Sequence, residues 1–117
     1  MPTTEEILFK YWGFVSFRSV QEEVVQAVVE KKDVLALLPT GGGKSICFQV
    51  PALMEPGICI VVSPLIALMK DQVQALQKKE IKAAMIFSGM NSRDIDITLD
   101  NCIYGDVKFL YISPERI

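Results

Sequence analysis

A glycine-rich segment that ends in lysine and serine is the part of this sequence best suited to chemistry. The segment reads Leu38-Pro39-Thr40-Gly41-Gly42-Gly43-Lys44-Ser45 and follows the apolar residues 34–37. Its glycines let phosphate oxygens approach backbone N–H groups, and Lys44 supplies a positive charge for the outer phosphates. Ser45 supplies a hydroxyl ligand for Mg²⁺, and the helix expected to follow adds unpaired N–H groups and a positive dipole. The pattern predicts a P-loop that binds a nucleotide together with Mg²⁺.

One position departs from the strict P-loop pattern G-x-x-x-x-G-K-[ST], because Leu38 stands where the pattern has its first glycine. The alternative is a glycine-rich surface hairpin that happens to contain Gly-Lys-Ser. A hairpin should be followed by a second alternating strand, whereas a helical segment follows this one. The context therefore favours the P-loop.

The composition allows one domain, or part of one. The chain has 117 residues, of which 50% are hydrophobic, which is enough to bury a core, and the length allows one domain but not two. The net charge is −2 and the pI is about 5.1, so the bulk electrostatics do not attract a polyanion. Any contact with nucleic acid must be local. Lys78, Lys79 and Lys82 surround Glu80 at an expected helix exit, where we predict solvated side chains rather than a nucleic-acid patch.

The cysteines and the apolar runs indicate the cellular compartment. Cys47, Cys59 and Cys102 form no C-x-x-C pair, and the sequence contains no histidine. We interpret them as reduced core residues, because a zinc site or a catalytic thiol would lack its partners. The amino-terminal segment 1–6 is polar and acidic, which does not suit a signal peptide. The longest apolar run, 58–69, is broken by Ser63-Pro64 and too short to span a bilayer. We expect a soluble cytoplasmic protein, nucleoid-associated if bacterial, with no membrane partner.

Two helices are predicted before the P-loop. The first opens at Thr4 and ends at Gly13, with Ile7, Leu8 and Tyr11 on its apolar side. The second follows a capping box formed by Ser19 and Glu22. Its apolar face carries Val20, Val24, Val25, Val28 and Val29.

From residue 33 the chain alternates short β-branched runs with helical runs, which predicts βαβ units and an α/β fold with a parallel sheet flanked by helices. The predicted strands are 34–38, 58–63, 83–87 and 107–112. The predicted helices are 44–53, 64–79 and 91–102. Pro51, Pro56 and Gly57 are expected to end the first of these helices.

Two strands end alike, in Ser63-Pro64 and Ser113-Pro114. Serine is a good N-cap and proline is favoured at the first helical position, so each pair predicts a corner from strand to helix. Because parallel strands point the same way, both corners and the P-loop should lie at the carboxyl edge of the sheet. The two helix N-termini could hold phosphates of a nucleic-acid strand, or the serines could serve capping alone.

Four segments, in this order, resemble the RecQ-type DNA helicases of superfamily two, and the resemblance covers the whole chain. Residues 13–21 (GFVSFRSVQ) resemble that family's aromatic adenine-recognition motif, and residues 38–45 resemble its motif I, Leu38 included. Residues 61–73 (VVSPLIALMKDQV) resemble motif Ia, and residues 111–116 (YISPER) resemble motif Ib. The resemblance implies an incomplete RecA-like P-loop domain that uses ATP and Mg²⁺.

The resemblance also implies roles for single residues. Gln21 should read the adenine edge with its amide, which can both donate and accept, and Arg18 should flank it. Phe14 stands where relatives commonly have tyrosine, so it can stack on the base but lacks a phenol hydroxyl. Lys44 takes the catalytic role at the phosphates, and Ser45 is the Mg²⁺ ligand. Because motifs Ia and Ib contact single-stranded DNA in this family, the implied DNA contacts are Ser63, Pro64, Ser113 and Arg116.

Some sequence motifs and domains of this family do not occur in these residues. The next motif, an Asp-Glu-x-His segment that orders Mg²⁺ and activates water, is missing, and Asp100 in a predicted helix is rejected as a substitute. The second RecA-like lobe with its arginine finger and the zinc-binding and winged-helix modules are missing too. We therefore expect residues 1–32 to form N-terminal helices with the adenine motif. Residues 33–117 should form the first part of the ATP-binding domain, truncated before the Asp-Glu-x-His motif.

Taken together, the resemblance implies the N-terminal part of an ATP-dependent 3′-to-5′ DNA helicase. Such an enzyme couples ATP hydrolysis to the unwinding of DNA in repair and recombination, with single-stranded or partly duplex DNA as its partner. We expect no turnover from these residues alone. One alternative is a non-motor P-loop module that binds a nucleotide or a protein partner. Another is a small-molecule P-loop kinase, which should lack the turn at 14–21.

Overall fold

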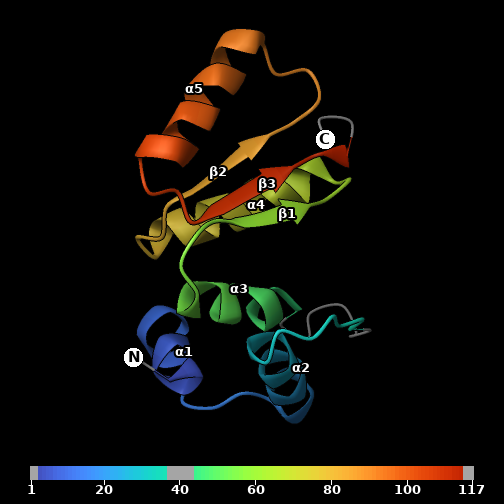
Figure 1. The fold of residues 1–117 in the computed structure, drawn as a ribbon, viewed down its shortest axis with the longest axis vertical. Coiled ribbons are helices and arrows are strands. Elements are labelled where there is room, and N and C mark those ends of the chain that lie inside the picture. Colours follow the sequence, from blue (N-terminus) through green and yellow to red (C-terminus); the bar gives the residue numbers. More distant parts are fainter. Residues whose placement is uncertain (1–2, 37–43, 115–117) are drawn as a thin grey trace. The chain divides into compact units, whose positions relative to one another are not determined.

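The computed structural model describes residues 3–36 and 44–114 (Figure 1). The chain forms two compact units, Met1–Pro56 and Gly57–Ile117. The predicted boundary between residues 32 and 33 lies inside the first unit, and that division stays a prediction. Across both described ranges, every helix is too short or too polar to cross a membrane.

The first helix, α1 (Thr4–Trp12), is capped at both ends. Thr3 Oγ1 accepts a hydrogen bond from the Glu6 N–H at 3.1 Å, so Thr3 and not Thr4 is the N-cap. Gly13 adopts a left-handed conformation with φ of 77°, which costs glycine little and ends the helix. The predicted end of this helix is confirmed.

The second helix, α2 (Ser19–Val29), begins one residue earlier than the predicted capping box requires. Gln21 Oε1 accepts a hydrogen bond from the Arg18 N–H at 3.0 Å, and the Glu22 N–H donates to the Arg18 carbonyl at 3.1 Å. Arg18 is therefore the N-cap, and Gln21 takes the position predicted for Glu22. The predicted Ser19 cap is wrong, because a glutamine already stands three residues after Arg18 and closes the same type of turn.

The third helix, α3 (Lys44–Met54), runs through Pro51. The predicted bounds of this helix, 44–53, are confirmed to within one residue, but Pro51, one of the three residues expected to end it, lies inside the helix. Proline removes one N–H donor from a helix, but both Pro51 and the adjacent Val50 are fully buried. The packing of this face outweighs the lost hydrogen bond, and the helix continues for three more residues.

The core of the first unit lies between α1 and α3, which pack together. Ile7 and Leu8 of α1 meet Ile46 and Val50 of α3. Half-buried side chains surround them, namely Tyr11, Trp12, Phe17, Leu53 and Met54. Burial of several large apolar side chains, each stabilising by about 1.5–3 kcal/mol, is what holds this helical unit.

Residues 34–36, the described part of the first predicted strand, are not a strand. Val34 is exposed, and the Leu35 side chain is 86% exposed. A parallel strand gains stability only by pairing with neighbours, and the described residues of this unit contain no strand to pair with. The prediction is therefore wrong for 34–36, and residues 37 and 38 lie outside the described ranges.

The second unit contains a parallel sheet of three strands, in agreement with the predicted fold class. The strands are β1 (Cys59–Val62), β2 (Ala83–Ile86) and β3 (Phe109–Ile112). Their order is β1-β3-β2, with Cys59 and Ala83 both opposite Phe109. The three predicted strands after residue 57 are confirmed, each slightly shorter than expected.

Two helices return the chain between these strands, α4 (Ile66–Lys78) and α5 (Ser92–Tyr104). Both pack against β2, and Figure 1 shows α4 behind the strands. Asn91 caps α5, because its Oδ1 accepts a hydrogen bond from the Asp94 N–H at 2.9 Å. This start agrees with the predicted one.

The central strand β3 carries the core of the second unit. Phe109, Leu110 and Tyr111 are buried, as are three residues of α4, Met69, Val73 and Leu76. The Tyr111 hydroxyl donates a hydrogen bond to Gln72 Oε1 at 2.7 Å, so this buried phenol has the polar partner it needs.

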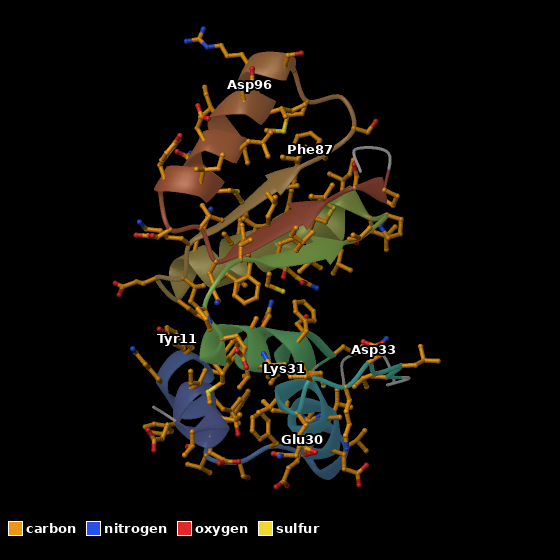
Figure 2. All side chains as sticks on the ribbon, in the orientation of Figure 1. Tyr11, Glu30, Lys31, Asp33, Phe87 and Asp96 are labelled. Carbon is orange, nitrogen blue, oxygen red and sulfur yellow. The ribbon has the colours of Figure 1, made fainter. Side chains whose placement is uncertain are left out.

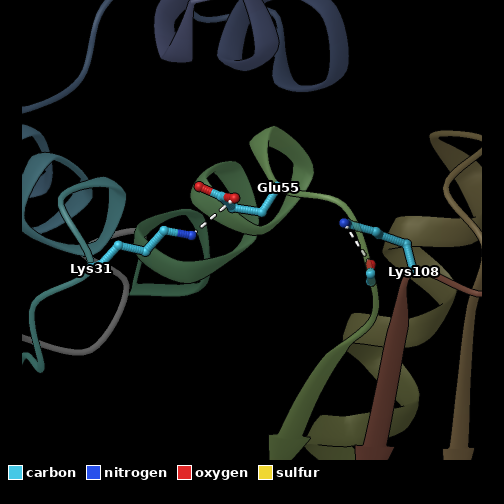
Figure 3. A network of polar contacts seen from close by, with 4 residues as sticks. Lys31, Glu55 and Lys108 are labelled. Carbon is cyan, nitrogen blue, oxygen red and sulfur yellow. Dashed lines mark hydrogen bonds and ion pairs between the residues drawn. The ribbon is translucent and has the colours of Figure 1, made fainter.

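Lysine side chains form polar contacts with neighbouring segments inside each unit, and Figure 3 shows those of Lys31 and Lys108. In the first unit, Lys31 Nζ lies 3.0 Å from a carboxylate oxygen of Glu55. In the second unit, Lys108 Nζ donates to the Gly57 carbonyl at 2.7 Å, and Lys82 Nζ donates to the Gly105 carbonyl at 3.0 Å. Lys82 and Lys108 precede β2 and β3, so these bonds secure the amino edge of the sheet.

Candidate nucleotide and nucleic-acid sites

The structure describes the last two residues of the predicted P-loop. Lys44 is exposed and Ser45 is half-buried, and both belong to the first turn described for α3. Thr40, Gly41, Gly42 and Gly43 lie outside the described residues. The buried side chains that follow, Ile46 and Cys47, anchor this end of the helix in the core. Lys44 and Ser45 are therefore carried on a packed helix end rather than on a free loop.

A small pocket of about 270 Å³ adjoins Lys44. Its lining comes from α2, from residues 34–36 and from α3, and consists of Val24, Val28, Val34, Ala36, Lys44, Cys47 and Phe48. Among the described lining residues Lys44 alone is charged, so its aliphatic stem can pack on apolar side chains while the ammonium stays in water. The volume is slightly below the roughly 300–1,000 Å³ of ligand pockets.

The predicted adenine-recognition residues lie in the same unit as Lys44. Phe14 is 55% exposed, which leaves its ring face accessible for stacking. Gln21 is 6% exposed, and its Oε1 atom accepts the bond from Arg18 N–H. An amide oxygen has two lone pairs, so this bond orients the amide without using its whole capacity. Since α2 packs against α3, the fold brings Gln21 and Lys44 onto neighbouring helices.

All three cysteines are thiols; Cys47 is buried, as predicted for a core residue, whereas Cys59 and Cys102 are half-buried. Burial raises the pKa of the Cys47 thiol above its usual range, and Cys47 therefore stays neutral beside Lys44. The described residues contain no group of three or more acidic, cysteine or histidine side chains that could hold a metal. Mg²⁺ needs only one or two protein oxygens when phosphates and water complete its shell, so the Ser45 hydroxyl is compatible with it.

A second candidate site lies at the carboxyl edge of the sheet in the second unit. The Ser63 N–H donates to the Ile112 carbonyl at 3.1 Å, and the Ser113 N–H donates to the Ile86 carbonyl at 3.0 Å. Ser63 and Ser113 thus extend neighbouring strands at the same edge, and the expectation that both corners share this edge is confirmed.

The local structure of the first corner differs from the prediction. Ser63 is not the N-cap of α4, which begins at Ile66 after Leu65. Instead, Ser63 Oγ accepts a hydrogen bond from the Leu65 N–H at 3.3 Å. This closes a tight serine turn that keeps Pro64 outside the helix and exposed.

The second corner places Ser113 inside the protein. The side chain is 1% exposed, and its Oγ atom accepts a hydrogen bond from the Ser88 N–H at 3.1 Å. Ser113 therefore joins the end of β3 to the segment after β2, and its predicted role as a DNA contact stays a prediction. The predicted contact Arg116 lies outside the described residues.

Sequence reasoning missed one polar feature of this edge. Lys70 of α4 holds its Nζ atom 5.6 Å from the ring centroid of Phe87, the residue directly after β2. The two residues are far apart in sequence. Nothing in the sequence distinguishes Lys70 from the other members of residues 61–73 or indicates its contact with Phe87.

Comparison with known proteins shows which protein family the chain matches. The sequence profile described as DEAD/DEAH box helicase matches residues 18–117. The chain is 45% identical over 113 residues to the ATP-dependent DNA helicase RecQ of Synechocystis sp. and 46% identical over 114 residues to that of Bacillus subtilis, with 97% of the chain covered each time. It is 42% identical over 123 residues to the ATP-dependent helicase SGS1 of Saccharomyces cerevisiae, with 99% of the chain covered. The chain spans 24%, 19% and 8%, respectively, of the lengths of these relatives.

Proposed function

The chain belongs to the DEAD/DEAH box helicase family, and from this premise we propose that it is the ATP- and DNA-binding first part of a RecQ-like, 3′-to-5′ DNA helicase. The relatives that are 45% and 46% identical over 97% of the chain carry the name ATP-dependent DNA helicase. Their names support DNA rather than RNA as the nucleic acid, and a role in repair and recombination is part of the proposal.

Nucleotide binding rests on one observation, the position of Lys44 and Ser45 in the first described turn of α3. The exposed ammonium of Lys44 neutralises phosphate charge, and the first-turn N–H groups of the helix can donate hydrogen bonds to phosphate oxygens. Thr40, Gly41, Gly42 and Gly43 complete this phosphate site in the proposal. Bound Mg²⁺ would add a Lewis acid at the outer phosphates, with the Ser45 hydroxyl among its ligands.

Adenine recognition is assigned to Gln21, Arg18 and Phe14. Gln21 can accept from the adenine N6 amine and donate to N7, whereas guanine presents acceptors at both corresponding positions. The bond from the Arg18 N–H at 3.0 Å supports this role, because it holds the amide in one orientation. Phe14 adds a stacking face.

DNA binding is assigned to the carboxyl edge of the sheet in the second unit. Ser63 and the exposed Pro64 are proposed contacts in a tight turn at this edge, and Arg116 remains a proposed contact. The buried hydroxyl of Ser113 supports a narrower role for that residue, in which it positions the neighbouring Ser88. The contacts are few and the net charge is −2, so we expect weak binding that falls with added salt.

Calorimetric titration with ATP and GTP tests the nucleotide site. The unaltered chain should prefer ATP, and Lys44→Ala should weaken both nucleotides alike because it acts on phosphate. Gln21→Glu is a more specific test of base recognition than Gln21→Ala. Glutamate keeps the oxygen that accepts from the Arg18 N–H but cannot donate to adenine N7. It should therefore lose the preference for ATP while α2 keeps its cap.

Gln26→Glu is the matched control, because Gln26 is an exposed glutamine on the same helix. It should retain the preference for ATP. Equal affinities of the unaltered chain for ATP and GTP would show that Gln21 does not read the base.

A further inference from the structure

Helix α5 carries two large apolar side chains on the side that faces away from its own sheet. Ile97 is 49% exposed and Tyr104 is 83% exposed. Figure 2 shows side chains between α5 and β2 and others on the outer side of α5. The helix packs against β2, and its half-buried residues, Ile95, Thr98 and Cys102, mark the packed side. At 3.6 residues per turn, Ile97 and Tyr104 lie on the opposite side.

These two residues form one stripe of α5 together with Arg93 and Asp100, and all four are exposed. The steps along the stripe are four, three and four residues, the alternation that places the a and d residues of a coiled coil on one seam. Single exposed apolar residues are ordinary, but the outer face of a surface helix is normally polar. Apolar residues at this spacing on the outer face therefore suit contact with a second helix.

The charged residues of the stripe have no ionic partner of their own. Among the described residues, neither Arg93 nor Asp100 forms an ion pair. When two copies of one helix pack antiparallel around a twofold axis, each end of the stripe meets the other end of the second copy. With the axis between Ile97 and Asp100, Arg93 lies opposite Tyr104 of the second copy and one turn from its Asp100. The stripe is therefore complementary to itself.

We propose that Arg93, Ile97, Asp100 and Tyr104 form a self-association surface, on which a second copy of this chain packs its own α5 antiparallel. The two Ile97 side chains meet near the axis and exclude water. At each end, the Arg93 guanidinium stacks on the Tyr104 ring of the second copy and pairs with its Asp100. None of the four residues belongs to the proposed nucleotide or DNA contacts, so this proposal does not depend on the proposed function.

The size of the surface sets the strength of the dimer. Helix α5 has 13 residues and is about 20 Å long. A single pair of such helices should bury less than the roughly 1,200–2,000 Å² of a stable protein interface. The dimer is therefore weak, and its population depends on the chain concentration.

Sedimentation equilibrium of the 117-residue chain over a range of concentrations tests the proposal. The average mass should rise from that of one chain toward that of two as the concentration increases. The mass of a single chain at every concentration up to about 1 mM would overturn the proposal, and this outer face of α5 would then serve no second copy.

Two charge variants test the antiparallel geometry. Arg93→Asp and Asp100→Arg each place like charges against one another at both ends of the seam, so each should raise the dissociation constant of the dimer about tenfold. In an equimolar mixture of the two variants, both ends again join opposite charges. The mixture should associate about as tightly as the unaltered chain. A mixture that associates no better than either variant alone would overturn the antiparallel pairing.

Ile97→Lys tests the centre of the seam, because it places two ammonium groups near the axis and should abolish the rise in mass. Leu99→Lys is the matched control, since Leu99 is 42% exposed on the same helix but lies about 200° around it from Ile97. It should leave the association unchanged. A thermal unfolding curve of each variant verifies that the second unit is folded. Equal effects of Ile97→Lys and Leu99→Lys would overturn the assignment of this stripe.

Discussion

The thiols of Cys47, Cys59 and Cys102 have pKa values above the ordinary one, because they are partly or fully withdrawn from water. Burial raises the pKa of each thiol, and at Cys59 the nearby charge of Lys108 offsets part of this rise. As pH increases, the unfolded chain loses its thiol protons first, so the folded state then binds more protons than the unfolded state. The resulting stabilisation is complete below the ordinary thiol pKa of about 8.5 and is lost as pH rises through the folded values.

This titration predicts how stability and reactivity depend on pH. The urea midpoint of the unaltered chain should decline more steeply above about pH 8.5 than that of a variant with all three cysteines changed to alanine. Iodoacetamide, which reacts with the thiolate, should modify the folded chain more slowly than the urea-unfolded chain at pH 8. Equal slopes of midpoint against pH would contradict the assigned pKa shifts.

The end of α1 depends on the backbone conformation of one glycine. Gly13 has φ of 77°, and a Cβ atom added there would meet nothing within 4 Å. Gly13→Ala should therefore cost about 1 kcal/mol through left-handed backbone strain alone, with no steric clash. Chemical denaturation measures this loss, which should appear as a lower midpoint with an unchanged slope.

Gly13→Asn is the matched variant, because asparagine tolerates the left-handed region better than alanine does. It should be destabilised less than Gly13→Ala. A larger loss for asparagine would mean that side-chain size, and not backbone conformation, limits this position.

The chain as a whole should bind ATP without hydrolysing it. The proposed phosphate site supplies Lys44 and Ser45, but these 117 residues contain neither the Asp-Glu-x-His segment nor the arginine finger of the second lobe. An arginine finger contributes about 10³ to 10⁵ in rate, or roughly 4–7 kcal/mol. We expect steady-state phosphate release at background level, even with single-stranded DNA and Mg²⁺ present.

The Lys44→Ala variant is the reference for this measurement. DNA-stimulated phosphate release that disappears in Lys44→Ala would contradict the expectation. It would mean that a catalytic carboxylate lies within these residues, and Asp71, Asp100 and Glu115 would be the side chains to replace next.

Local patterns in the sequence were sufficient to predict several features of the structure. The β-branched runs predicted β1, β2 and β3 as parallel strands, because their period and the intervening helices depend on neighbouring residues. Gly13 and Asn91 marked helix ends through backbone preferences that act within one turn. The shared edge of Ser63 and Ser113 followed from the direction of parallel strands, and residues 18–117 carried the family pattern.

Other features depended on contacts between distant residues, which local patterns do not encode. Pro51 remains inside α3 because its face is buried against the core, and Ser113 is covered because the segment after β2 reaches its hydroxyl. Residues 34–36 have strand-like composition but are not a strand, since pairing needs a neighbour. Lys70 meets Phe87 only when α4 packs beside β2. Periodicity and capping act over a few residues and can be derived from sequence, whereas burial and side-chain partners are decided when separate elements pack together.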